Sequence, residues 1–142
     1  MTWGIAITAK RKQGFLVLIE PDSSVRDALT VLLRGEGWEV REAADCLELQ
    51  QRIDESAAGS GPVAVISEAS LPRCSPQEIL EMSAAHQLPV VFTGHDLSLQ
   101  GAVDLIRQGA TDFLDKPFPQ SRLLDLLERL ARGQNGPSAR QS

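Results

Sequence analysis

The sequence predicts an α/β fold, a doubly wound sheet of five parallel strands with helices on both faces. Short apolar runs, typical of strands buried on both sides, alternate along the 142 residues with longer amphipathic segments. Such alternation indicates parallel strands joined by helical crossovers. Apolar residues make up 42% of the chain, which is enough for the buried core of one globular domain.

The strands are predicted from their apolar runs and turn residues, in chain order, at residues 15–19, 38–43, 63–67, 89–93 and 112–114. The first run, Phe15-Leu16-Val17-Leu18-Ile19, contains no polar residue and therefore indicates a central strand. The second alternates polar and apolar residues, which indicates a strand nearer the edge of the sheet.

Capping residues mark where the helices begin. Ser23 or Ser24 caps the first helix and Asp45 caps the second. Pro76 lies in the first turn of the third helix, where its missing N–H costs no hydrogen bond. The fourth and fifth helices begin at about Leu99 and Gln120. The five helices are predicted to end at about residues 34, 57, 86, 108 and 131.

Composition limits the classes of function. The net charge of −5 and the pI near 5.0 argue against a nucleic-acid-binding surface, which needs clustered Lys and Arg. Cys46 and Cys74 have no further Cys or His at metal-ligand spacing, so we expect two reduced thiols and no zinc site. The N-terminal segment is too short for a membrane span and lacks the order of a signal peptide. A cytoplasmic protein is predicted.

The domain is predicted to span residues 14–132. Residues 1–13 form an N-terminal extension, for which an added edge strand and a loose segment both stay open. Residues 133–142 read as a disordered tail or a linker, so the chain could also be a truncated regulator without its output domain.

Four polar residues follow the predicted strands at their carboxyl ends. They are Glu20 after the first strand, Glu68 after the third, Thr93 after the fourth and Lys116 after the fifth. Ligands of open parallel sheets bind beyond these ends. Two carboxylates, a hydroxyl and an ammonium at one edge indicate a site for a phosphate group and a cation.

Four segments resemble the receiver domains of bacterial response regulators, and the likeness is strongest to receivers of the nitrogen-fixation and nitrogen-regulation type. The resemblance covers roughly residues 14 to 132 and rests on Leu18-Ile19-Glu20-Pro21-Asp22, Ile66-Ser67-Glu68-Ala69-Ser70-Leu71-Pro72, Val90-Val91-Phe92-Thr93-Gly94-His95 and residues 109–118, which include Asp115-Lys116-Pro117-Phe118.

The resemblance implies a flavodoxin-like sheet with strand order 2-1-3-4-5 and a role for each matching residue. In the family a carboxylate accepts a phosphoryl group, Mg²⁺ spreads the developing charge, and a lysine pairs with acceptor and phosphate. Glu20 matches the first metal-binding acid and Lys116 the lysine. Thr93 matches the switch hydroxyl and Phe113 the switch aromatic residue. The Lys116–Pro117 bond is commonly cis in such domains.

Two positions depart from the family pattern. Glu68 occupies the place of the acceptor aspartate, and Pro21 that of an acid that binds the metal directly. Mg²⁺ needs near-ideal oxygen geometry, and a misplacement of about 1 Å can cost ~10²-fold in rate. Asp22 is a possible substitute ligand, although its position is peripheral in the family.

We therefore expect a pseudo-receiver, a protein-interaction module without enzymatic activity or a cofactor. The expected partner is a histidine kinase or a downstream effector, and a homodimer is possible. The predicted interaction face comprises the fourth helix, the fifth strand and the last helix, with Arg122, Asp125 and Arg129 on the last helix.

Several alternatives stay open. Glu68 or Asp22 could accept a phosphoryl group with Mg²⁺, and a weak residual Mg²⁺ site at Glu20 and Glu68 is possible. Glu68 could also mimic the phosphorylated state, or simply keep a charge in a wet site, and in either case we expect it to form an ion pair with Lys116. His95 is a candidate phosphotransfer residue, but a solvated loop histidine is the simpler reading. A nucleotide-binding enzyme is disfavoured because the first strand–helix turn lacks glycines.

Overall fold

The computed structural model describes residues 12–56, 60–95 and 97–133, and these form one parallel sheet with the strand order β2-β1-β3-β4-β5. The strands are β1 (Phe15–Ile19), β2 (Glu39–Glu42), β3 (Pro62–Glu68), β4 (Val90–Gly94) and β5 (Asp112–Asp115). The predicted fold class and strand order are confirmed.

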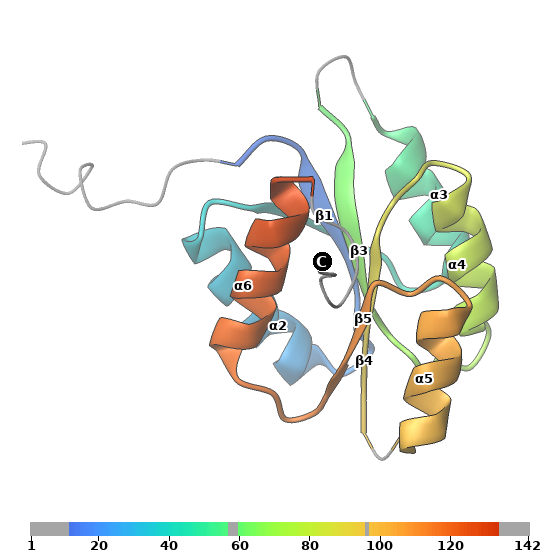
Figure 1. The fold of residues 1–142 in the computed structure, drawn as a ribbon. Helices are drawn as coiled ribbons and strands as arrows, with labels where there is room; N and C mark the ends of the chain where they lie inside the picture. The colour runs from blue at the N-terminus through green and yellow to red at the C-terminus, as the bar shows by residue number, and fades with distance from the viewer. Residues whose placement is uncertain (1–11, 57–59, 96, 134–142) are drawn as a thin grey trace, which may run out of the picture.

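Helices cover both faces of the sheet. They are α2 (Ser23–Gly35), α3 (Cys46–Asp54), α4 (Pro76–Ala84), α5 (Leu99–Arg107) and α6 (Gln120–Ala131). In Figure 1, α2 and α6 lie on one side of the sheet, and α3, α4 and α5 lie on the other. The β5 edge of the sheet therefore lies between α5 and α6.

Each central strand supplies two separate cores. Phe15, Val17 and Ile19 belong to the apolar cluster on the α3–α4–α5 side, whereas Leu16 and Leu18 belong to the cluster on the α2–α6 side. All five side chains of β1 are at most 1% exposed. The unbroken apolar run of this strand is thus explained by burial on both faces.

Most helix starts match the expected caps, but the first does not. The N-cap of α2 is Asp22, whose Oδ1 accepts hydrogen bonds from the backbone N–H groups of Ser24 at 2.9 Å and Val25 at 3.2 Å. The prediction of Ser23 or Ser24 as the cap was wrong. Asp45 caps α3 as predicted. The capping side chain of α2 is therefore one of the acidic residues beside the predicted site.

Several helices end earlier than predicted, and several strands end later. The structure ends α3 at Asp54 and α4 at Ala84. Gln87, shortly after α4, has a φ of 56°, which an α-helix does not allow. The strands β3, β4 and β5 each end one residue later than predicted, at Glu68, Gly94 and Asp115. Glu68 is therefore the last residue of a buried strand.

The expectation of two reduced cysteines was wrong, because Cys46 and Cys74 form a disulfide. Their Cα atoms lie 5.6 Å apart, in the usual range for such a bond. Cys46 begins α3 and Cys74 lies just before α4, which packs beside α3 on the same face of the sheet. A separation of 28 residues in the sequence hid this proximity.

Most of residues 1–13 and of residues 133–142 lies outside the described part of the chain, including the possible edge strand and the disordered tail. The backbone N–H of Lys12 donates to the carbonyl of Gly37 at 2.9 Å, and its ammonium pairs with Glu128 at 2.8 Å. Among the described residues, no helix is both long and apolar enough to span a membrane.

Candidate functional site

The carboxyl edge of the sheet brings together the four polar residues expected there. Glu20 follows β1, Glu68 ends β3, and Lys116 follows β5. Thr93 in β4 is the strand partner of Glu68. Because all strands are parallel, their carboxyl ends meet at one edge. Glu20 is 4% exposed, Thr93 is 1% exposed and Glu68 is 8% exposed, so this is a recessed polar cluster and not a set of solvated strand ends.

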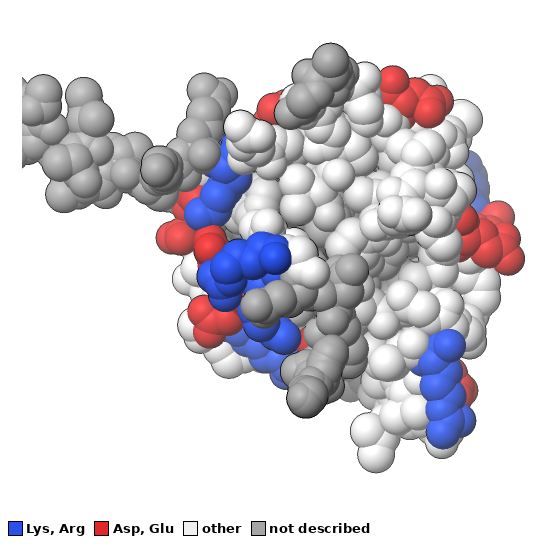
Figure 2. Space-filling view, turned by 45° about the horizontal axis from the view of Figure 1, so that its top comes forward, with Lys and Arg blue, Asp and Glu red and all other residues white. Residues whose placement is uncertain are grey.

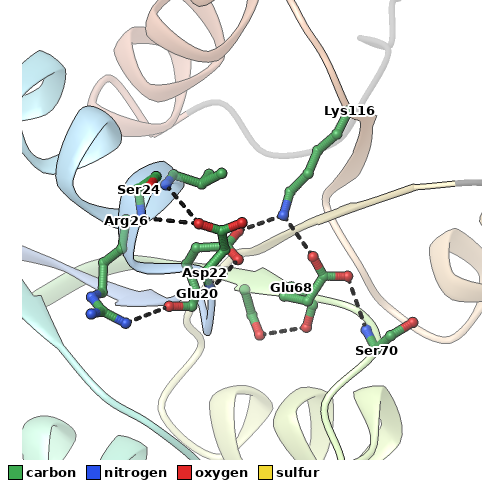
Figure 3. A network of polar contacts seen from close by, with 9 residues as sticks. Glu20, Asp22, Ser24, Arg26, Glu68, Ser70 and Lys116 are labelled. Carbon is green, nitrogen blue, oxygen red and sulfur yellow. Dashed lines mark hydrogen bonds and ion pairs between the residues drawn. The ribbon is translucent and has the colours of Figure 1, made fainter.

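The ammonium group of Lys116 joins the two carboxylates. Its Nζ lies 2.5 Å from Oε1 of Glu20 and 2.7 Å from Oε1 of Glu68, and the lysine side chain is only 8% exposed. Figure 3 shows Lys116 reaching from the loop after β5 to a point between the two glutamates. The predicted ion pair of Glu68 and Lys116 is confirmed, and Glu20 is a second partner that sequence reasoning did not assign.

A backbone amide fixes the second oxygen of each carboxylate. Oε2 of Glu20 accepts from the N–H of Asp22 at 3.1 Å, and Oε2 of Glu68 accepts from the N–H of Ser70 at 3.2 Å. Each glutamate therefore binds the ammonium with one oxygen and its own following loop with the other. These contacts leave little freedom for either carboxylate to turn toward another ligand.

Burial and ion pairing act in opposite directions on Lys116. Burial disfavours the ammonium, but the hydrogen bonds and charges of Glu20 and Glu68 outweigh it, so the pKa of Lys116 is raised. The lysine is therefore a cation at neutral pH. One positive and two negative groups leave a formal charge of −1 at this edge.

The residues after β1 supply one further carboxylate, that of Asp22, and one of its oxygens is already used. Pro21 is exposed and has no side-chain oxygen. Oδ1 of Asp22 is used by the cap of α2, and the guanidinium of Arg26 donates to the carbonyl of Glu20 at 3.0 Å. Mg²⁺ prefers six oxygen ligands in near-ideal octahedral geometry. The two buried carboxylates are already held by an ammonium, so this donor set does not fit the magnesium site that the resemblance implies.

Comparison with known proteins assigns the chain to a family. The family model of the response regulator receiver domain matches residues 16–128. The chain belongs to this family. The receiver is 33% identical over 132 residues to the transcriptional regulatory protein FixJ of Bradyrhizobium diazoefficiens, a match that covers 90% of this chain and 61% of that protein. It is 36% identical over 118 residues to the C4-dicarboxylate transport transcriptional regulatory protein DctD of Pseudomonas aeruginosa, which covers 80% of this chain and 24% of DctD.

Solved structures give the same result. Full-length FixJ from B. japonicum matches this receiver with a TM-score of 0.72 and 28% identity, over 85% of this chain and 59% of that one. The receiver domain of NtrX from Brucella abortus matches with a TM-score of 0.72 and 29% identity, over 82% of this chain and 98% of that one. The chain thus spans 61% of the length of the FixJ relative and a smaller part of DctD.

A glycine controls the space between the site and the predicted aromatic switch of the receiver. A Cβ atom added to Gly94 would lie 3.3 Å from Oε2 of Glu68 and 3.5 Å from the ring of Phe113. Phe113 is half-buried and packs against the cluster on the α3–α4–α5 side. Gly94 was not predicted to shape the site. Its position directly after Thr93, at the end of a strand beside the site, was the available clue.

The remaining predicted residues have no described hydrogen bond or ion pair with Lys116, although His95 lines a pocket beside it. His95 is exposed in the loop after β4. On α6, Arg122 and Asp125 are exposed and Arg129 is half-buried, and the guanidinium of Arg122 lies 3.7 Å from Asp112 of β5. The Lys116–Pro117 peptide bond is cis, as expected.

Proposed function

We propose that this receiver is a pseudo-receiver, a signalling and protein-interaction module whose output does not require phosphorylation. The observation that carries the proposal is the bridge from Lys116 to both Glu20 and Glu68. In the receivers that this chain resembles, the lysine pairs with the acceptor and its phosphate, whereas the acids after the first strand hold a metal ion. Here the ammonium of Lys116 forms ion pairs with both Glu20 and Glu68.

The chemistry of acceptance is also weakened at two positions. Glu68 places its carboxylate one methylene further from the backbone than an aspartate would, and Pro21 removes a metal ligand. Phosphoryl transfer depends almost entirely on positioning and charge stabilisation. The two changes therefore affect the same reaction. We propose that the domain uses no magnesium ion and has no enzymatic turnover.

Glu68 acts in this proposal as a structural partner of Lys116 and not as a full mimic of a phosphorylated residue. A phosphoryl group carries about −1.5 to −2 charges and three acceptor oxygens, whereas a carboxylate carries one charge. With no phosphate to bias two states, the output face is held in one dominant conformation. The carboxylate thus maintains the resting arrangement of the site.

The proposed partners are proteins. The net charge of −5 disfavours binding to a phosphate backbone. On the face seen in Figure 2, Lys and Arg side chains lie beside Asp and Glu side chains, and uncharged residues cover most of the rest. We place the interaction surface on α5, β5 and α6, with Arg122, Asp125 and Arg129, and the protein in the cytoplasm. Its partner is a histidine kinase, a downstream effector or a second copy of the chain.

The rival function is a working phosphotransfer receiver in which Glu68 or Asp22 accepts the phosphoryl group with Mg²⁺. Incubation with acetyl phosphate and Mg²⁺, followed by intact-protein mass spectrometry, separates the two. The pseudo-receiver keeps its mass. A gain of one phosphoryl group that Glu68→Gln abolishes would establish the rival at Glu68, and a gain that only Asp22→Asn abolishes would establish it at Asp22.

Magnesium binding gives a separate test of the metal proposal. Calorimetric titration should show no saturable heat in the sub-millimolar range. Trp38 is a poor fluorescent reporter for this purpose, since it is 3% exposed and directly precedes β2. It therefore lies at the amino end of a strand, whereas the Lys116 cluster lies at the carboxyl ends. Saturable binding that Glu20→Gln removes would show that the acids hold the ion despite Lys116.

A further inference from the structure

The disulfide of Cys46 and Cys74 lies next to the loop that carries Glu68. Cys46 is the first residue of α3, directly after its N-cap Asp45. Cys74 directly precedes Ser75, the N-cap of α4. Only residues 69–73 separate Glu68 from Cys74. The cross-link therefore ties the start of α3 to the far end of the loop that follows the acceptor position.

The two sulfur atoms differ in access. Cys74 is 2% exposed, whereas Cys46 is half-buried, so a small thiol from solution meets Cys46 first. Cys46 also lies at the N-terminus of a helix, where the helix dipole favours a thiolate, while the carboxylate of Glu78 within 4.8 Å opposes one. An accessible thiolate next to a buried second thiol is the usual arrangement of an attacking and a resolving cysteine.

We propose that Cys46 and Cys74 form a redox modification site that exchanges with small thiols and disulfides of the glutathione class. On oxidation the Cys46 thiolate attacks one sulfur of glutathione disulfide, which forms a mixed disulfide and releases one glutathione thiolate. The Cys74 thiolate then attacks the Cys46 sulfur and releases the second glutathione. Two electrons pass from the protein to glutathione disulfide, and the two cysteine protons end on the two glutathione thiols.

The redox state of this site acts on the loop of residues 69–74. At its start, the N–H of Ala69 donates to the carbonyl of Thr93 at 2.8 Å, and the N–H of Ser70 donates to Glu68. At its end, the disulfide holds Cys74 against α3. Reduction removes the covalent anchor and leaves the loop held at the Glu68 end and by the capping box of α4.

The apolar cluster beneath the disulfide includes Cys74 but consists mostly of other side chains. Leu49 and Ile53 of α3 and Ile79 of α4 pack in this one apolar cluster, and each is at most 3% exposed. Because these side chains also hold α3 and α4 together, we expect the effect of reduction to be local to the loop. This inference stands whether or not Glu68 accepts a phosphoryl group, because it rests on other residues and another reaction.

The first measurement follows thiol content in glutathione buffers of increasing ratio of reduced to oxidised glutathione, with alkylation of the native protein and mass spectrometry. A chelator is included because the two sulfurs and the carboxylate of Glu78 lie within 4.8 Å of one another, close enough to share a metal ion after reduction. We expect a single transition between the internal disulfide and two free thiols. A persistent glutathione adduct on Cys46, or two thiols that stay reduced in excess glutathione disulfide, would overturn the proposed site.

The second measurement is amide hydrogen exchange of the oxidised and reduced protein. We expect the amides of Ser70, Leu71 and Arg73 to exchange about tenfold faster or more after reduction, because a covalent link opposes local opening of the loop it closes. The amides of β1 should not change. Cys46→Ser is the matched control, because it cannot form the disulfide. Its loop amides should exchange as fast as those of the reduced protein in every buffer. Equal exchange in the oxidised and fully reduced parent would refute the link to the loop.

Discussion

The Nζ of Lys116 lies 2.7 Å from Oε1 of Glu68, although the two residues come from different strand ends and are 48 positions apart in the sequence. The same ammonium lies 2.5 Å from Glu20. The three side chains are at most 10% exposed, so they depend on one another for charge compensation. The ion pairing of these three side chains, at the position where the family carries its phosphoryl group, is the basis of the pseudo-receiver proposal.

Removal of the shared ammonium should destabilise the protein strongly. Lys116→Met leaves two nearly buried carboxylates without their counter-charge, and breaking a buried pair typically costs ~3–5 kcal/mol of unfolding free energy. Urea denaturation measures the loss. The control Lys12→Met removes a lysine whose partner, Glu128, has a side chain that is 42% exposed, and should have a much smaller effect.

A second variant tests whether the cost of Lys116→Met comes from uncompensated charge. Adding Glu68→Gln removes one of the two carboxylates, so the double variant should recover part of the lost stability. If the double variant is as unstable as the sum of its single substitutions, the two residues are not coupled, and the bridge does not stabilise the site.

The stability that Lys116 contributes should be lost as the pH rises into the alkaline range. Its pKa in the folded protein is raised above the ordinary value of 10.5. A group with a raised folded pKa contributes fully below its unfolded pKa and loses this contribution as pH rises through the folded value. The difference in unfolding free energy between the parent and Lys116→Met should thus be constant from about pH 7 to about pH 9 and shrink above about pH 10.5. A difference that already shrinks near neutral pH would mean that the ammonium is not stabilised by the glutamates.

Gly94→Ala should disturb the site through contact with Glu68. The new Cβ would lie 3.3 Å from Oε2 of Glu68, so the carboxylate must shift and weaken its hydrogen bond to Ser70. We expect a loss of about 0.5–1.5 kcal/mol, the usual net value of one hydrogen bond.

The matched control for that substitution is Gly35→Ala, because a Cβ at Gly35, in α2, meets no atom within 4 Å. Alanine there should stabilise by about 0.5–1 kcal/mol through helix propensity. Opposite signs in urea denaturation are therefore expected. The expectation would be contradicted if Gly94→Ala were as stable as the parent and Glu68 had not moved in the crystal structure of the variant. That result would show that a Cβ atom fits at this position without displacing the carboxylate.

The sequence predicted the strand ends well because their apolar runs are short and clearly bounded. The position of Glu68 at the end of β3 and of Lys116 after β5 followed from this, and so did their ion pair. The cap by Asp22 was missed because two serines follow it, and only the backbone geometry decides which residue caps α2. The disulfide was missed because the contact between α3 and α4 depends on how the crossovers pack. The second partner of Lys116 depends on side-chain conformation, which no spacing rule supplies.

Binding to partners should depend on α6 and not on the Lys116 cluster. Arg122 is 54% exposed at the proposed interaction face, and Arg122→Glu reverses its charge with little effect on the core. Proteins that the parent captures from its source cells should be lost by Arg122→Glu and retained by Glu68→Gln. The reverse pattern would show that Glu68 sets the conformation of the output face and is a true mimic of the phosphorylated state.

The most direct test of the central claim restores the two missing carboxylate positions. Pro21→Asp with Glu68→Asp rebuilds the acceptor and its metal ligand around Glu20, Thr93 and Lys116, which are already in place. The parent and the double variant are incubated with acetyl phosphate and Mg²⁺, and their intact masses are compared. The account predicts that the double variant gains one phosphoryl group and the parent gains none. A parent that gains a phosphoryl group at Glu68 or Asp22 would contradict it.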